Sequence, residues 1–255
     1  MTSRYQVTLN GISLSGLSEE IYILDVNYGD PAFNDIRYKT AKRHGSRKDD
    51  RIFTSSTVSI SFEIHAYDTH KRQAIRNAVC TWAKNGGRLE INDREGQFLQ
   101  CECMKYPVIE SVRNWTDPLT IVFAGNEIPF WQERDPKTIT LSAGTSGNGS
   151  LFVPGSVDDA LVEVNIHANA SLSSVGLTVN GRTLALSGLS VASGKDIKIT
   201  YDERGIQSIK VDNTSLLDKR TGVDDLLARC GEVNTVSFTA SASVTVTFSA
   251  RGYLV

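Results

Sequence analysis

A run of strict alternation between apolar and polar residues, from Thr57 to Tyr67, constrains the fold most. One set of side chains in this run is apolar: Val58, Ile60, Phe62, Ile64 and Ala66. The side chains between them are mostly polar: Ser59, Ser61, Glu63 and His65. A period of two places successive side chains on opposite faces of a strand. The sequence therefore predicts a β-strand with one buried face and one face open to solvent or to a partner.

An amphipathic helix is predicted directly after this strand, from about Lys71 to Asn85. Its apolar residues recur at helical spacing and form one stripe: Ala74, Ile75, Ala78, Val79, Trp82 and Ala83. Asp68 and Thr69 are the expected N-caps. Gly86 and Gly87 end the helix, because glycine readily takes the left-handed conformation there.

The remaining elements of the first half are predicted to be strands. They lie at Tyr22–Val26, Arg88–Asn92, Gln97–Met104 and Leu119–Phe123. An Asp-Arg-Glu-Gly turn at residues 93–96 joins the second of these to the third. Residues 1–133 are therefore expected to form a β domain with one packed helix, closed by the core aromatic residues of Pro129-Phe130-Trp131.

The composition changes after this domain. Residues 134–150 contain Asp-Pro and then a stretch rich in Gly and Ser that has little apolar surface to bury. We predict a linker there. Residues 151–255 read as short strands separated by turns, with a strong hairpin turn at Asn180-Gly181 and one short helical turn at Val223–Arg229. This pattern predicts an antiparallel β-sandwich.

Residues in patterns typical of catalytic or metal-binding sites are few. Cys101 and Cys103 fall on the same face of one predicted strand, but a tetrahedral zinc site needs two more suitably spaced ligands, so free thiols under the helix are expected. Neither a Gly-x-Ser-x-Gly nucleophile motif nor a phosphate-binding glycine loop occurs. We therefore predict a protein that is not an enzyme, with no metal and no cofactor.

The net charge and the hydropathy of the chain limit the classes of partner that we expect. The 27 basic and 29 acidic residues give a net charge of -2, which offers no electrostatic reason to expect binding along nucleic acid. The chain lacks an apolar run of the roughly 18 residues that a membrane-spanning helix needs. Its first residues do not resemble a signal peptide, and its four cysteines are too few for a disulfide scaffold. Synthesis in a cytoplasm is the expectation.

The densest run of charge, from Lys42 to Arg51, precedes the alternating strand. Its basic and acidic residues are interleaved, so two interpretations stay open: a solvated loop, or a hairpin arm that reaches a neighbouring subunit. The second makes this run and the polar face of the strand the candidate interface. The residues concerned are Lys42, Arg43, Arg47, Lys48, Asp49, Asp50, Arg51, Ser59, Ser61, Glu63 and His65.

The order of these elements resembles the distal tail proteins of long-tailed phages, the Dit family. The matching elements are the leading strand at Tyr22–Val26, the charged run, the alternating strand, the helix and the Pro129-Phe130-Trp131 exit. In the second half, residues 226–236 and the strand ending at residues 248–253 are similar to the family's closing pattern, although Cys230-Gly231-Glu232 departs from its usual turn.

The resemblance implies a mainly β protein with a ring-forming, belt-like first domain and a galectin-like sandwich as the second. It implies a structural role in the virion as a hexameric baseplate hub, assembled in the host cytoplasm. The expected partners are the tail tube, the tail-associated lysin or central fibre, and receptor-binding parts. A second hypothesis is a carbohydrate-binding module, and a third is a wall hydrolase. The second domain lacks Trp and has only Tyr201 and Tyr253 as platforms for a sugar.

Overall fold

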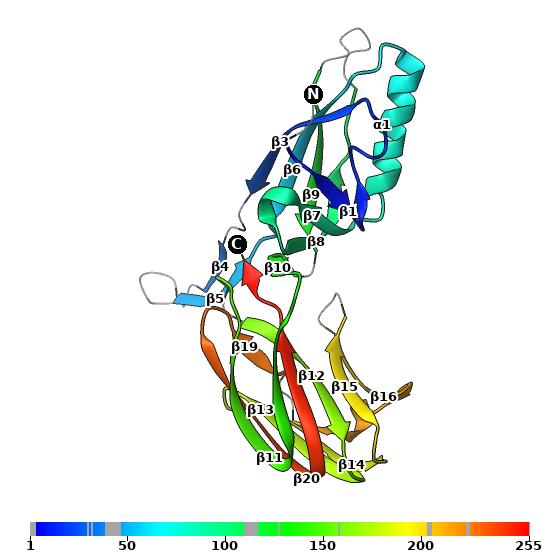
Figure 1. Ribbon diagram of the computed structural model, residues 1–255. Coiled ribbons are helices and arrows are strands. Elements are labelled where there is room, and N and C mark those ends of the chain that lie inside the picture. Colours follow the sequence, from blue (N-terminus) through cyan, green and yellow to red (C-terminus); the bar gives the residue numbers. More distant parts are fainter. Residues whose placement is uncertain are drawn as a thin grey trace. The chain divides into compact units, whose positions relative to one another are not determined.

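The computed structural model describes residues 4–29, 31, 33–38, 47–109, 117–126, 128–157, 159–202, 206–222 and 225–254, with the backbone alone for 33–38 and 47–53. The chain divides into two compact units, Met1–Trp131 and Gln132–Leu254 (Figure 1). The described residues are mainly strand, and they contain one α-helix, which lies in the first unit. The predicted mainly β fold class is confirmed.

The first unit is built on an antiparallel sheet with the strand order β2-β1-β7-β8-β9-β6-β3. Its strands are β1 (Val7–Leu9), β2 (Ile12–Ser13), β3 (Ile21–Gly29), β6 (Thr57–Ile64), β7 (Gly87–Ile91), β8 (Gln97–Lys105) and β9 (Leu119–Gly125). The 3₁₀ turn η1 (Asn92–Arg94) joins β7 to β8. Strands β3, β6, β7, β8 and β9 lie where strands were predicted, whereas β1 and β2 were not predicted.

Strand β6 confirms the alternation read from the sequence. Val58, Ile60, Phe62 and Ile64 are fully buried, whereas Ser59 and Ser61 remain partly exposed. In the register, Ser61 lies opposite Asp25 of β3 on one side and Thr120 of β9 on the other. Strand β6 is therefore an interior strand of the sheet, and its polar residues lie on the face away from the core.

Helix α1 (Thr69–Ala83) covers the apolar face of the sheet, and Asp68 caps it by accepting a hydrogen bond from the backbone N–H of His70 (2.9 Å). The buried residues differ from the predicted stripe: Arg72 is buried with Ile75, Val79 and Ala83, whereas Ala74 and Ala78 are exposed and Trp82 is half-buried.

Two side-chain hydrogen bonds from the flanks of the helix to the backbone account for this difference between the predicted stripe and the buried residues. Trp82 Nε1 donates to the Ile12 carbonyl oxygen (3.0 Å), and Arg76 Nε donates to the Pro107 carbonyl oxygen (2.9 Å). The helix is therefore fixed by its polar flanks as well as by its apolar face. No helix among the described residues is long and apolar enough to cross a bilayer.

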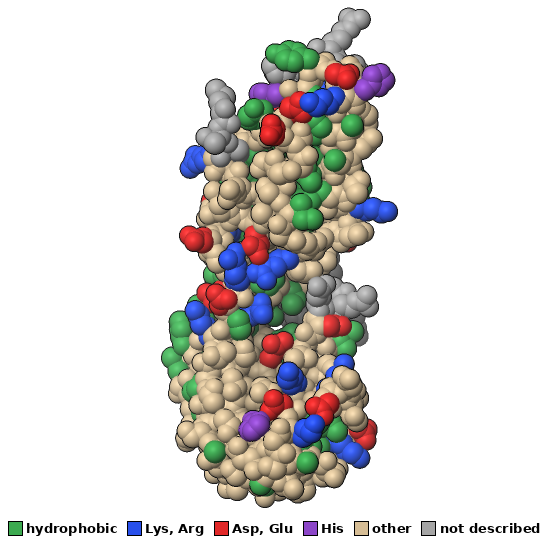
Figure 2. Space-filling view, turned by 45° about the vertical axis from the view of Figure 1, so that its right-hand side comes forward, with side chains coloured by type: hydrophobic (Ala, Val, Ile, Leu, Met, Phe, Trp, Pro, Cys, Tyr) green, Lys and Arg blue, Asp and Glu red, His purple; other side chains and the backbone are tan. Residues whose placement is uncertain are grey.

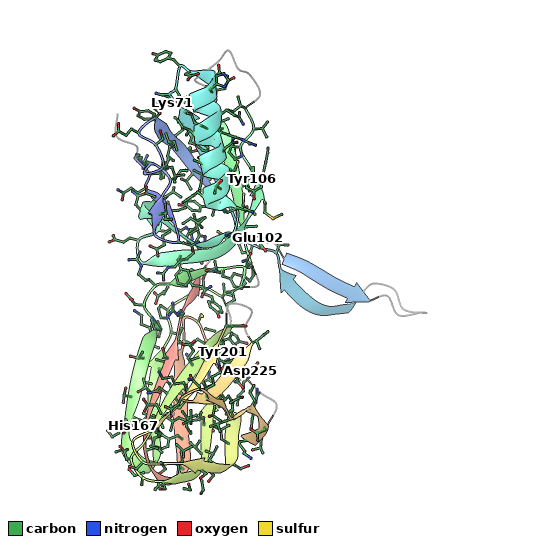
Figure 3. All side chains as sticks on the ribbon, turned by 90° about the vertical axis from the view of Figure 1, so that its right-hand side faces the viewer. Lys71, Glu102, Tyr106, His167, Tyr201 and Asp225 are labelled. Carbon is green, nitrogen blue, oxygen red and sulfur yellow. The ribbon has the colours of Figure 1, made fainter. Side chains whose placement is uncertain are left out.

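Strands β4 (Phe33–Tyr38) and β5 (Arg47–Phe53) form a separate two-stranded antiparallel sheet between β3 and β6 in the chain (Figure 3). The register runs from Phe33 opposite Phe53 to Tyr38 opposite Arg47. We call this hairpin the arm.

The second unit is an antiparallel assembly with the order β17-β16-β15-β12-β20-β13-β14-β18, while β11 pairs with β20 and β19 with β12. Its larger strands are β11 (Lys137–Phe152), β12 (Asp159–Ala168), β13 (Leu172–Val179), β14 (Arg182–Val191), β15 (Asp196–Tyr201), β16 (Gln207–Val211) and β20 (Val233–Ala250). Its shorter elements are β17 (Thr214–Ser215), η2 (Leu217–Lys219), β18 (Arg220–Thr221), β19 (Leu227–Arg229) and β21 (Tyr253–Leu254). Strand β10 (Trp131–Glu133) contains the division between the units.

Strand β20 belongs to both layers of this sandwich. Its first half pairs with β13 through Val236–Ala240, and its second half pairs with β12 through Val244–Ala250. Strand β11 follows β20 along its whole length, with irregularities on either side of Gly144. The predicted hairpin at Asn180-Gly181 is confirmed, with positive φ angles of 49° and 83°.

Two expectations for this half are wrong. Residues 134–150 were expected to be a linker, but β11 covers residues 137–152. The glycines there make room for neighbours: a Cβ on Gly147 would lie 2.6 Å from the Phe238 ring, and one on Gly149 would lie 2.7 Å from Ile139 Cδ1. The helical turn expected at Val223–Arg229 is instead strand β19 over its last three residues, because Leu227 pairs with Leu161 of β12.

Candidate assembly interface

Four predicted interface residues, three in β6 and His65 directly after it, share one surface of the first unit. Ser59, Ser61, Glu63 and His65 lie on the side of the sheet opposite helix α1 and are partly exposed. We call this surface the open face. His65 Nε2 lies 2.6 Å from Glu63 Oε2, and the Tyr22 ring lies 4.3 Å from the His65 ring between centroids. The structure therefore brings these four residues together, but their contact with another chain stays a prediction.

The arm holds the remaining predicted residues. Arg47, Lys48, Asp49, Asp50 and Arg51 are part of β5, which pairs with β4, so the hairpin interpretation describes their backbone correctly. Lys42 and Arg43 lie outside the described residues. Whether the arm contacts a neighbouring subunit stays a prediction.

The sequence did not reveal a cluster at the base of the arm. The Arg94 guanidinium lies 4.6 Å from the centroid of the Tyr28 ring and 4.8 Å from that of the Trp131 ring, and these two rings meet edge to face at 5.8 Å. The Tyr28 hydroxyl donates to Asp93. Burial raises the pKa of Tyr28, and the Asp93 carboxylate raises it further. The cluster ties the end of β3, from which the arm departs, to η1 and β10.

Among the described residues, two stretches of the first unit's sheet lack a partner strand on one side. Strand β3 is the last strand in the order, and its Leu24 and Asp25 are exposed at a bulge. Strand β8 lies inside the order, between β7 and β9, but β7 pairs with it only as far as Cys101, and Met104, Lys105 and Tyr106 beyond that point are exposed. We call these the β3 edge and the β8 edge. Unpaired edges of this kind are templates for pairing with another chain.

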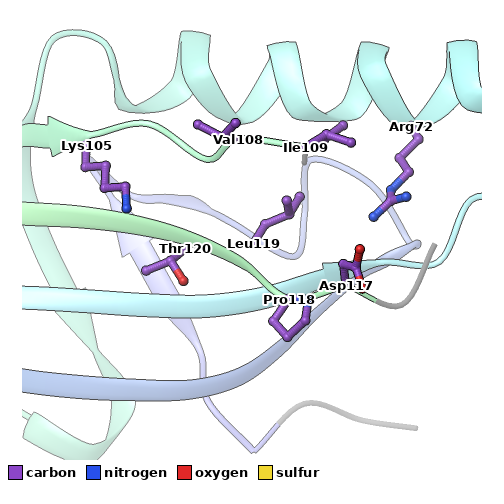
Figure 4. A pocket seen from close by; sticks show the side chains of 8 residues that line it. All are labelled: Arg72, Lys105, Val108, Ile109, Asp117, Pro118, Leu119 and Thr120. Atoms are coloured by element: carbon purple, nitrogen blue, oxygen red, sulfur yellow. The ribbon is translucent and has the colours of Figure 1, made fainter. Parts of the chain in front are cut away.

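A pocket of about 440 Å³ lies beside the β8 edge, between helix α1 and the start of β9 (Figure 4). Its polar lining comprises Arg72, Lys105, Asp117 and Thr120, and its apolar lining comprises Val108, Ile109, Pro118 and Leu119. Figure 4 shows Arg72 extending from the helix towards Asp117. Arg76 keeps the wall of the pocket in place through its bond to Pro107. The sequence contains no local pattern that predicts this pocket.

The cysteines of the first unit are free thiols, as predicted. Burial, with a smaller contribution from the charge of Cys103, raises the pKa of Cys101 to about 12. Burial also raises the pKa of Cys103, with a further contribution from Cys80 on the helix. The three thiols therefore lie near one another. Among the described residues, no group of three or more His, Cys, Asp or Glu side chains is placed to hold a metal ion.

The two tyrosines of the second unit are engaged within the fold. Tyr253 is 8% exposed. The Tyr201 hydroxyl accepts a hydrogen bond from Gln207 Nε2 (2.8 Å), and Arg220 and Asp225 complete this polar cluster. Figure 3 shows Tyr201 and Asp225 in one region of the unit. A sugar platform requires an exposed ring, so neither tyrosine supports the carbohydrate-binding hypothesis.

Comparisons with known proteins identify the fold. No protein-family model matches the chain, and no curated protein matches it by sequence. The crystal structure of the Dit protein of phage SPP1, described as a hub adsorption apparatus of phages that infect Gram-positive bacteria, matches with a TM-score of 0.72 and 10% identity over 97% of this chain and 98% of that one. The phage P2 baseplate in its activated conformation with Ca matches with a TM-score of 0.52 and 8% identity over 99% and 98%.

The chain has the fold of a phage Dit hub protein. The likeness extends over both units, so the resemblance inferred from element order is confirmed at the level of the fold. The galectin-like character of the second unit stays a prediction.

Proposed function

We propose that this chain is a structural component of a phage tail tip. Six copies form a hub that joins the tail tube to the tail-associated lysin or central fibre and carries receptor-binding parts. The observation that carries this proposal is the full-length likeness to the Dit hub protein of SPP1. The chain is not an enzyme in this role, and it acts in the virion after assembly in the bacterial cytoplasm.

The topology of the first unit supports a ring. A ring of one chain needs two different surfaces that meet head to tail and close. The β3 edge and the β8 edge are such a pair, since β3 ends the strand order whereas the β8 edge is separated from it by β9 and β6. Closing a sheet through neighbouring copies removes the unpaired edges that each copy exposes alone.

The arm and the open face are further contact surfaces in this proposal. The open face presents Ser59, Ser61 and Glu63, which are small or polar groups suited to a hydrated contact rather than an apolar core. Interleaved charges on β5 favour one register between copies over others. These residues are therefore proposed to position copies, while the sheet edges hold them together.

The native mass and symmetry of the purified full-length chain test the proposal. Light scattering is expected to give the mass of six copies, and negative-stain images are expected to show rings with six-fold symmetry. The arm is then the first place to substitute. A chain that stays monomeric at every concentration contradicts a ring that closes by itself.

A further inference from the structure

The β3 edge presents an apolar and an acidic side chain next to each other. Leu24 is 45% exposed, and the adjacent Asp25 is exposed as well. Both lie at the bulge where the pairing with β6 shifts between Ile23 and Asp25. A leucine exposed on an unpaired edge favours contact with another chain over contact with water.

The β8 edge offers a receptor of matching chemistry. The pocket beside it has an apolar wall that includes Val108 and Ile109, and its charged lining has two cations, Arg72 and Lys105, against the single carboxylate of Asp117. Large apolar side chains are exposed around it, since Val108 is 58% exposed and Met104 63%. Exposed apolar groups beside a pocket are typical of protein contact sites.

The register places the two features at the same level of the sheet. Asp25 lies opposite Ser61 of β6, and Ser61 lies opposite Thr120 of β9, which lines the pocket. Lys105 lies opposite Val122, two residues along β9. The acidic residue of the β8 edge, Glu102, lies opposite Ala124 and is therefore further from that level. For strands that run along the ring axis, rotation about that axis keeps each residue at its own height, so edge groups of similar height meet across the seam.

The geometry points to a specific seam between copies: Leu24 and Asp25 of one copy enter the pocket beside the β8 edge of the next copy. Leu24 contacts Val108 and Ile109, and the Asp25 carboxylate faces Lys105 at the mouth of the pocket. This inference rests on the proposed ring, and it names the residues that close it. The partner is a second copy of this chain.

Charge reversal in the full-length chain tests the seam. Asp25→Lys and Lys105→Glu are each expected to raise the concentration needed for half-assembly by at least about tenfold, because each places like charges across a partly buried contact. The double variant, Asp25→Lys with Lys105→Glu, is expected to recover most of that loss. Native mass measurements over a dilution series give the assembly midpoint.

Matched controls come from the second unit. Lys195 and Asp212 form an exposed ion pair there, with Lys195 Nζ 3.0 Å from Asp212 Oδ2. Lys195→Glu and Asp212→Lys make the same reversals outside the seam and are expected to leave the midpoint unchanged. The tryptophan fluorescence of each first-unit variant, compared with the wild type, confirms that the unit is folded.

A trapping variant keeps the test independent of affinity. With Leu24→Cys and Val108→Cys on one chain, mild oxidation by oxidised glutathione is expected to link copies into a ladder that ends at six, whereas either substitution alone gives no ladder. Rings that tolerate both charge reversals, or a double-cysteine chain that forms no ladder, overturn the seam while leaving the ring in place. A wild-type chain that never assembles overturns both.

Discussion

The two units differ in how they cover the faces and edges of their β-sheets. The first unit covers one face of its sheet with helix α1, and its described residues leave the open face uncovered and the β3 edge and the β8 edge unpaired. The second unit folds its own strands over each other, because β20 passes from one layer to the other and β11 follows it. In the proposed ring, neighbouring copies complete the first unit, whereas the second unit covers its own strands.

Large apolar side chains are exposed in both units, but they differ in their surroundings. Figure 2 shows apolar side chains on the surface of both units, including a group on the visible side of the first unit. In that unit, exposed apolar residues such as Met104 and Val108 flank a pocket. The second unit contains a fully buried polar side chain, Asn234, which is 0% exposed. Exposed apolar side chains beside a pocket are typical of contact sites. A buried amide with its hydrogen bonds made is typical of a structural role.

Asn234→Ala gives the largest expected effect and acts on the second unit alone. The Asn234 amide accepts from the Arg229 N–H (2.6 Å) and donates to the carbonyl oxygens of Leu151 and Arg229 (3.2 and 3.0 Å). Leaving these buried backbone groups without partners is expected to cost about 4 kcal/mol in the free energy of unfolding.

The two units have separate optical probes. All three tryptophans precede residue 132, so tryptophan fluorescence reports the first unit and far-ultraviolet circular dichroism reports both. The Asn234 variant is expected to lower the midpoint of the second unit's transition and leave the fluorescence transition in place. Asn213→Ala, at an exposed turn, is the control and is expected to be neutral. Equal shifts in both probes would show that the units do not unfold separately.

Alkaline pH is expected to act first on the first unit. The folded-state pKa of Cys101 is raised from 9.0 to about 12 by burial, so its contribution to stability is complete below pH 9 and is lost as the pH rises towards 12. At pH 10.5 the loss is about 2 kcal/mol, because each pH unit above the ordinary pKa of the thiol removes about 1.36 kcal/mol. In the second unit, Tyr201 and Tyr253 also have raised pKa values, but from an ordinary value of 10.0.

Between pH 9 and 10 the fluorescence transition is therefore expected to weaken before the transition of the second unit does. Urea unfolding at pH 8.0, 9.5 and 10.5 measures this. Cys101→Ala is expected to flatten the dependence of the fluorescence transition on pH. A variant that keeps the full dependence would assign it to another group.

Gly147→Ala gives the smallest expected effect, and its sign is the informative result. In a flexible linker this change stabilises a protein slightly by restricting the unfolded chain. In β11 the new Cβ would lie 2.6 Å from the buried ring of Phe238, so a loss of about 1.5 kcal/mol is expected. Thermal unfolding followed by circular dichroism measures the sign, with Ser142→Ala at an exposed position of β11 as the control.

Local patterns were enough to predict the elements that depend on local physics. The alternation at 57–64, the Asp68 cap and the Asn180-Gly181 turn are each set by a few adjacent residues, and the structure confirms them. The Gly-rich segment at 134–150 misled prediction because glycine serves both flexible linkers and tightly packed strands. Only the position of Phe238, about ninety residues further along the chain, distinguishes the two.

Less of the candidate interface could be predicted from the sequence, for the same reason. The cluster of Tyr28, Arg94 and Trp131 and the pocket near Lys105 join residues that are far apart in the sequence. Nothing local identifies such sets, since they arise from strand order and register. The Ser59 to His65 face was predictable as a surface because a single strand defines it, but a strand pattern does not reveal what that surface contacts.

The pairing of β11 with β20 also bears on how such a protein changes over generations. Lys137 near the beginning of the second unit lies opposite Ala250 near its end, so the chain enters and leaves that unit at neighbouring points. A module with adjacent ends can be lost, enlarged or exchanged by recombination without altering the course of the chain that carries it. Natural variation in proteins of this design is therefore expected to concentrate in the second unit, while the first unit retains the geometry that neighbouring copies require in the proposed ring.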